Sequence, residues 1–166
     1  MCEFIDREKP IVICLNAKSA IPPEKVDAYI TCSTERLAVE LELYRAQGRP
    51  LIAPRAMLNP FLQKKVGDIE ILDYGVNVEE GCFAFDETGC TIPAFLPAPY
   101  ALAFANAAGA ERILLAGFDG FADDDPRQVV MASVIELYHR QADAAPVIAI
   151  TPTNYSVDQS TRYTLE

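Results

Sequence analysis

The chain has 166 residues, of which 51% are hydrophobic and 23% charged, and its formal net charge is -10 at pH 7. This length and composition predict one globular domain with a substantial core. The acidic balance argues against a nucleic-acid partner, because proteins that bind nucleic acids show a basic footprint. No apolar run reaches the ~18 residues of a membrane-spanning helix, so we expect no membrane partner.

The cysteines favour a reduced, cytoplasmic protein. They are odd in number and widely spaced, at positions 2, 14, 32, 82 and 90. No pair has the spacing of a zinc motif, and the single histidine, His139, does not complete a ligand set. Cys14 and Cys32 lie in or beside apolar runs, where a free cysteine behaves as a small hydrophobic residue. We therefore expect reduced thiols and no metal site.

The first half of the chain alternates predicted strands and helices. A continuous apolar run at residues 11–15 indicates a central parallel strand that is buried on both faces. Further strands are predicted at 27–31, 50–53 and 69–73, and short helices begin at Pro22 and Asn59. A longer helix over 35–47 has Ser33 or Thr34 as its N-cap and ends at Gly48.

The second half continues the alternation after an insertion. Residues 82–92 predict a hairpin or an irregular segment with its turn at 86–89. Pro93, Pro97 and Pro99 predict an extended stretch, and an amphipathic helix is predicted over 98–108. The apolar run at 113–116 indicates another buried strand. A helix over 129–141 and a last strand at 147–150 complete the predicted elements.

Strands that alternate with helices predict an α/β fold, a Rossmann-like three-layer sandwich with a mostly parallel sheet and helices on both faces. In such sheets, ligands bind outside the carboxyl ends of the strands. The chain lacks the glycine-rich fingerprints of dinucleotide-binding and P-loop proteins. Candidate ligand contacts are therefore sought at the strand ends themselves.

Four residues at predicted strand ends are candidate ligand contacts: Asn16, Ser19, Arg36 and Asp119. Asn16 and Ser19 follow the first strand, where backbone N–H groups face a ligand; a polar turn closed by the Asn16 side chain is the alternative. Arg36 can bind a phosphate or carboxylate through two hydrogen bonds, or form a surface ion pair. Asp119 lies between two glycines that permit close approach. It can accept from sugar hydroxyls or bond its own backbone in a turn.

For the other polar residues we favour a structural interpretation. The three aspartates at 123–125 have the oxygen chemistry of a Mg²⁺ site, but such a run before a proline more often forms a solvated helix N-terminus. His139 has no evident partner that would make it a general base. Tyr155 and Tyr163 would either rim the pocket or pack the tail against the domain. We assign no catalytic residue and no cofactor.

Two short motifs carry a family resemblance. The first strand ends in Asn-x-x-Ser at 16–19, and Ile-Leu-Leu-x-Gly-Phe-Asp-Gly-Phe at 113–121 precedes a final strand and a Thr-Pro-Thr-x-Tyr tail. In this layout the chain resembles the Rossmann-like domains grouped with bacterial sialyltransferases and 6-hydroxymethylpterin diphosphokinase-like proteins. It is also similar to a C-terminal domain of proteins of the hydroxymethylglutaryl-CoA lyase and 4-hydroxy-2-oxovalerate aldolase type. Those proteins carry a TIM-barrel metallolyase ahead of it, often in surface-polysaccharide settings.

The resemblance implies a nucleotide-contacting turn at Asn16 and Ser19. It also implies an acidic contact at Asp119, which matches the Gly-Ile-Asp-Phe-Tyr motif of the sialyltransferases. Lys18 stands where that family has proline, and Phe121 lacks the hydroxyl of the family's tyrosine. We therefore expect a domain that binds a nucleotide, a nucleotide sugar or another phosphorylated ligand without transferase chemistry.

The resemblance also implies a longer parent chain. We expect residues 1–166 to form one Rossmann-like domain, excised from a polypeptide whose upstream aldolase-like barrel carries any lyase activity. In that setting the segment is an accessory binding domain. Two alternatives remain: a stand-alone transferase of sialyltransferase or pterin diphosphokinase type, and a non-catalytic domain that forms homo-oligomers.

Overall fold

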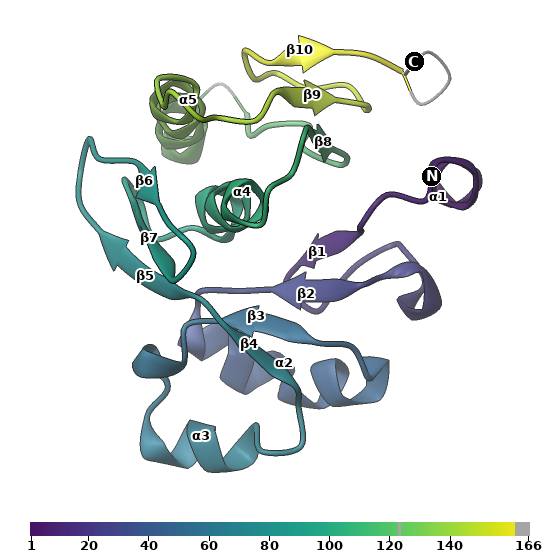
Figure 1. Cartoon of the computed structure of the whole chain (residues 1–166), viewed down its shortest axis with the longest axis vertical. Helices are drawn as coiled ribbons and strands as arrows, with labels where there is room; N and C mark the ends of the chain where they lie inside the picture. The colour runs from purple at the N-terminus through teal and green to yellow at the C-terminus, as the bar shows by residue number, and fades with distance from the viewer. Residues whose placement is uncertain (123, 162–166) are drawn as a thin grey trace.

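Mostly parallel strands flanked by helices make up the computed structural model of this chain, which describes residues 1–122 and 124–161 (Figure 1). Within that part the strands form three sheets, and two of these are wholly parallel. The predicted α/β class, with mostly parallel strands and helices on both faces, is confirmed. The parallel pairs are distributed over three sheets, because the third, mixed sheet also contains one, whereas the sequence pattern predicted a single sheet.

The four-stranded sheet carries the first half of the chain. Its strands, in spatial order, are β1 (Ile13–Leu15), β2 (Ala28–Ile30), β3 (Leu51–Ala53) and β4 (Ile71–Asp73). The connections contain η1 (Pro23–Lys25), α2 (Thr34–Gln47), η2 (Arg55–Met57) and α3 (Pro60–Lys65). In Figure 1, α2 and α3 cover the same face of this sheet, as successive crossovers of one hand require.

The ends of α2 and α3 follow local sequence signals. The Ser33 hydroxyl accepts a hydrogen bond from the Arg36 N–H and caps α2. Gly48 ends that helix in the left-handed region, at φ 61°. Asn59 caps α3 by accepting from the Leu62 N–H. These predicted caps are confirmed, because each depends only on residues within one turn of the helix end.

One core lies between the four-stranded sheet and α2. The apolar face of α2 presents Leu37, Leu41 and Tyr44 to the sheet residues Tyr29 and Leu51, and all five are nearly inaccessible to solvent. The rings of Tyr29 and Tyr44 meet edge to face, with centroids 5.9 Å apart. Full burial of each such leucine contributes about 1.5–3 kcal/mol, so this packing holds α2 and the loops at its ends.

A small mixed sheet follows β4. It contains β5 (Gly75–Val78), β6 (Ala84–Phe85) and β7 (Gly89–Ile92), in the order β5-β7-β6. The antiparallel pair β6–β7 is the predicted hairpin, whereas β5 was not predicted. Gly75 and Gly89 pair directly, and a Cβ on Gly89 would lie 2.8 Å from the Gly75 carbonyl oxygen. Only glycine fits there.

The last third of the chain forms the second parallel sheet. It contains α4 (Pro97–Ala107), β8 (Ile113–Leu115), α5 (Pro126–His139), β9 (Val147–Ala149) and β10 (Asp158–Gln159), with the strand order β10-β9-β8. The extended stretch predicted at Pro97 and Pro99 is wrong, because both prolines lie in the first turn of α4, where a missing N–H costs no intrahelical bond. The strand at 147–150 is not the last, since β10 pairs with β9.

A second core joins the two parallel sheets through α4. Ile30 and Ile52, from the other face of the four-stranded sheet, share this core with Tyr100 of α4 and with Val134 and Tyr138 of α5. The Tyr100 hydroxyl donates to the Tyr74 carbonyl oxygen at 2.5 Å, and so finds a partner inside the core. Figure 1 shows α4 between the four-stranded sheet and the upper strands.

The prediction that β1 is buried on both faces is wrong, and the strand predicted to be buried at 113–116 is buried only at Leu115. Each strand lies at the end of its own sheet, and the side chains of Ile13, Cys14 and Leu15 in β1 are only half-buried. Ile113 and Leu114 of β8 are half-buried as well. A short helix, α1 (Cys2–Glu8), precedes β1 and was also not predicted.

Candidate functional site

The chain turns sharply where β1 ends, at Asn16. This residue has φ 60°, a left-handed conformation that asparagine tolerates better than most residues. Its N–H donates to the Ile30 carbonyl oxygen at 2.9 Å, and its side-chain oxygen accepts from the Thr31 hydroxyl at 3.1 Å. The chain bends at Asn16, but the Asn16 side chain bonds Thr31 at the end of the neighbouring strand instead of closing the predicted turn.

Thr31 links this turn to the N-terminus of α2. The Thr31 side chain is 1% exposed, and its oxygen also accepts from the Ser33 N–H at 3.3 Å. The Ser33 hydroxyl donates to the Glu35 carboxylate at 3.3 Å. The first N–H groups of a helix have no intrahelical acceptors, so the start of α2 adds backbone donors beside Asn16.

Arg36 adds a cation to the same helix end. Its side chain is exposed, and it forms no salt bridge with any of the described residues. The surface ion pair considered for this residue is therefore not formed within that part of the chain. The guanidinium stays available for an anion, although the Glu35 carboxylate competes at the same turn.

A buried polar layer supports the Asn16 turn from below. The Glu40 carboxylate of α2, 9% exposed, accepts from the Ala17 N–H at 3.2 Å. Gln47 donates from its side chain to the Ala17 carbonyl oxygen at 2.6 Å. Burial, followed by the charge of Glu40, raises the pKa of the buried Tyr44 hydroxyl. This layer holds the turn against α2.

Sequence reasoning missed Thr31 and Glu40. The signal for Glu40 was a carboxylate among apolar residues on the buried face of α2, three residues after Leu37 and four before Tyr44. A charged residue on such a face requires a partner. Thr31 follows β2 directly, so its position also gave a usable signal.

Ser19 belongs to its own loop. Its hydroxyl lies 3.2 Å from the Cys14 sulfur and accepts from the Ile21 N–H at 3.0 Å. Burial raises the pKa of the Cys14 thiol. No hydrogen bond joins Ser19 to Asn16 in the described part of the chain, so the two residues predicted to act together share only a loop.

Asp119 lies in the loop after β8, and this loop is bonded to the segment after β9. The Asn154 N–H donates to the Asp119 backbone oxygen at 3.0 Å. A Cβ on Gly120 would meet Asn154 at 3.1 Å and the Gln128 side chain at 3.2 Å. The close approach that Gly120 permits is therefore occupied by the chain itself. The carboxylate of Asp119 is exposed.

The four predicted contacts do not form one group. In Figure 1 the strands β9 and β10 run opposite to β1 and β2, so the two parallel sheets point their carboxyl ends in opposite directions. Among the described residues, no hydrogen bond or ion pair connects Asp119 with Asn16, Ser19 or Arg36. Asn16 and Arg36 lie at the end of the four-stranded sheet, and Asp119 belongs to the other sheet.

The remaining candidates have structural roles. Asp125 caps α5 by accepting from the Arg127 N–H, and the Arg127 guanidinium holds the pKa of Asp125 below its ordinary value. His139 is exposed at the end of α5, and Tyr155 is buried in the second core. Asp123 and Tyr163 lie outside the described residues. In the described ranges, no group of three or more His, Cys, Asp or Glu side chains could hold a metal ion.

Comparison with protein-family models, with curated proteins and with solved structures finds no match to this chain. Within residues 1–122 and 124–161, none of the helices has the length and apolar character needed to cross a bilayer.

Proposed function

We propose that this protein binds a small phosphorylated ligand, a nucleotide or a nucleotide sugar, at the carboxyl end of the four-stranded sheet. The observation that carries the proposal is the pair of hydrogen bonds at Thr31, whose side chain joins the Asn16 turn to the N-terminus of α2. At that junction the Asn16 amide follows the end of β1. The free N–H groups of α2 and the Arg36 cation follow the end of β2, the neighbouring strand.

Each part of the junction suits a different part of the ligand. The N-terminus of the 14-residue helix α2 attracts a phosphate through its backbone N–H groups and its dipole. The Arg36 guanidinium can form two parallel hydrogen bonds with phosphate oxygens. The Asn16 amide can bond a sugar hydroxyl. Glu35 opposes anion binding, so its carboxylate must turn away when the ligand binds.

Binding without chemistry is the form of the proposal that the geometry favours. The Ser19 hydroxyl contacts Cys14 and the Ile21 N–H, with no described general base beside it. His139 is an exposed residue at the C-terminal end of α5, and α5 does not belong to the four-stranded sheet or to its connections. We further propose, from the resemblance of residues 113–121, that the domain serves as an accessory to an aldolase-type partner domain.

Isothermal titration of the purified chain with CMP, UDP-glucose, ATP and inorganic phosphate tests the proposal. At least one nucleotide should bind, and Arg36→Gln should weaken it about tenfold, or about 1.4 kcal/mol, through loss of a charge-assisted contact. Glu35→Gln should strengthen binding. Arg140→Gln is the matched control, because Arg140 is an exposed arginine that pairs with Glu136 on α5.

Three results would count against the proposal. The first is no binding of any nucleotide at millimolar concentration, and the second is an equal effect of Arg36→Gln and Arg140→Gln. The third is a loss of affinity in Asp119→Ala, which would move the site to the other sheet. Turnover of a CMP-sugar or ATP by the folded chain would instead establish the transferase alternative.

A further inference from the structure

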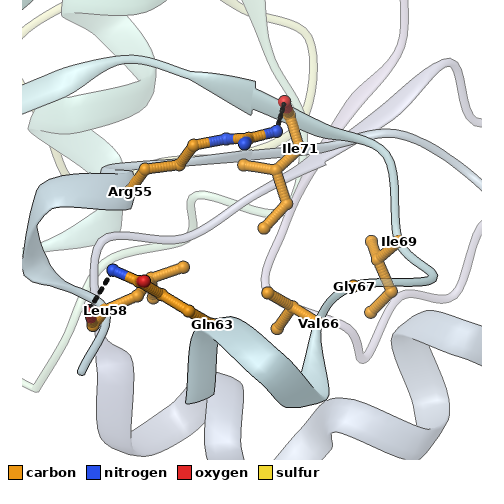
Figure 2. A pocket seen from close by; sticks show the side chains of 7 residues that line it. All are labelled: Arg55, Leu58, Gln63, Val66, Gly67, Ile69 and Ile71. Atoms are coloured by element: carbon orange, nitrogen blue, oxygen red, sulfur yellow. Dashed lines mark hydrogen bonds between the residues drawn. The ribbon is translucent and has the colours of Figure 1, made fainter. Parts of the chain in front are cut away.

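A pocket of about 280 Å³ lies between α3 and β4, away from the Asn16 turn (Figure 2). Its walls come from the segment after β3, from α3 and from the edge strand β4. The residues on which the inference depends are Arg55, Leu58, Gln63, Val66 and Ile71. The volume is close to the lower end for small-molecule sites, roughly 300 Å³.

Arg55 places a positive charge on one wall of the pocket. One terminal nitrogen of its guanidinium donates to the Ile71 carbonyl oxygen at 3.1 Å, on the open edge of β4. Asp73 accepts from the Arg55 backbone N–H at 2.8 Å, but no carboxylate among the described residues forms a salt bridge with the guanidinium. The remaining guanidinium N–H groups are available for an anion.

Gln63 places a second polar group on the opposite wall. Its side-chain nitrogen donates to the Leu58 carbonyl oxygen at 2.8 Å, which holds the amide in place. No described residue bonds the other end of this amide. In Figure 2 the Arg55 guanidinium and the Gln63 amide flank a space into which the side chains of Val66 and Ile71 point.

The floor of the pocket is apolar. Leu58, Val66 and Ile71 are 4%, 5% and 9% exposed, so they are already fixed by the packing of α3 on the sheet. A ligand for this pocket therefore combines a short apolar body with an anionic group. A carboxylate fits the guanidinium best, because its two oxygens match the planar fork of donors.

We propose that this pocket binds a small apolar carboxylate. Arg55 holds the carboxylate, Val66 and Ile71 contact the apolar body, and Gln63 bonds a polar edge of the ligand. The same chemistry is offered by a free short-chain acid and by the C-terminal residue of a peptide. The site is independent of the proposed phosphate site, and either one can exist without the other.

The test is a titration followed by amide NMR shifts of the whole chain. Hexanoate represents the free acid, and N-acetyl-alanyl-leucine represents a peptide C-terminus. Hexanol and acetate are the controls, since the first lacks the charge and the second lacks the apolar body. We expect one of the acids to bind, with both controls at least about tenfold weaker. The acid that binds identifies the source.

Two variants test the assigned residues. Arg55→Gln should weaken binding at least about tenfold, and Gln63→Glu should do the same by bringing a second negative charge near the carboxylate. Arg49→Gln is the matched control and should leave the affinity unchanged, because Arg49 also donates to a backbone oxygen, that of Pro23, but does not line the pocket. Circular dichroism checks folding, and Gln63 is an exposed residue whose substitution spares the core.

The proposal is overturned if neither acid shifts the pocket resonances at about 10 mM. Equal binding of hexanol and hexanoate also overturns it, since a carboxylate would then not be recognised. Unchanged affinity in folded Gln63→Glu has the same consequence. None of these outcomes affects the nucleotide titration, so the two proposals succeed or fail separately.

Discussion

The Thr31 hydroxyl donates to the side-chain oxygen of Asn16 across 3.1 Å, and this bond connects the carboxyl ends of two adjacent parallel strands. Thr31 is almost completely buried, whereas Asn16 is half-buried and its backbone is in the left-handed conformation. A buried donor thus fixes the orientation of a half-exposed amide. The following predictions test that relationship and three other features of the fold.

Thr31→Val should lower the free energy of unfolding by about 1–2 kcal/mol, because it leaves the Asn16 side chain and the Ser33 N–H without their partner. Urea denaturation measures the change. Thr91→Val in β7 is the control, since Thr91 is half-buried and makes no side-chain hydrogen bond within the described part of the chain. An equal effect of the two substitutions would show that the Thr31 bonds contribute nothing.

Asn16→Ala should destabilise the protein more than Asn16→Gly, by about 1 kcal/mol, because alanine carries a Cβ penalty in the left-handed region that glycine avoids. Both variants lose the bond to Thr31, so the difference between their free energies of unfolding measures only the cost of the left-handed backbone conformation. Lys9→Gly provides a calibration: Lys9 has φ 49° at the end of α1, and its replacement should stabilise the chain. Thermal unfolding measures all three, and a more stable Asn16→Ala would contradict the backbone assignment.

Gly120→Ala should destabilise the protein more than Gly117→Ala. Both glycines have positive φ, 102° and 73°, so both variants incur backbone strain. Only at Gly120 does the added Cβ meet other atoms, those of Asn154 and Gln128, whereas at Gly117 nothing lies within 4 Å. Chemical denaturation compares the two. Equal losses of stability would mean that the loop after β8 can move away from Asn154.

Stability should fall as the pH rises above 9. Burial raises the pKa of Cys32 from 9.0 to about 11 and that of Cys90 to about 12. The unfolded thiols lose their protons from about pH 9 upward, while the folded thiols keep theirs, so rising pH favours unfolding until the folded thiols ionise too. The double variant Cys32→Ala/Cys90→Ala should show a smaller fall between pH 8 and about 10.5.

The measurement is the urea midpoint of unfolding at each pH. The slope of this midpoint against pH is compared between wild type and double variant, because a cavity left by the substitutions lowers the midpoint equally at every pH. A residual slope is expected, because burial also raises the pKa of Tyr100. If wild type and double variant have the same slope, the two thiols do not carry the alkaline sensitivity.

Parts of the fold with local causes were predictable. Ser33, Gly48 and Asn59 mark helix ends through bonds within one turn, so the pattern of residues was enough. Prediction failed for elements that are held by contacts with residues far away in the sequence. β5 contains Gly75 and is held by its pairing with Gly89, a contact that no local pattern records.

By itself, the sequence determined the α/β class, the order of most helices and strands, and the helix ends at Ser33, Gly48 and Asn59. Only the tertiary structure decided that β1 and β8 lie at the ends of different sheets, and that Asp119 lies apart from Asn16. The physical reason is that the same apolar run is compatible with a central strand and with a half-buried edge strand. Which neighbours a strand acquires depends on backbone hydrogen bonds and packing between residues far apart in the chain.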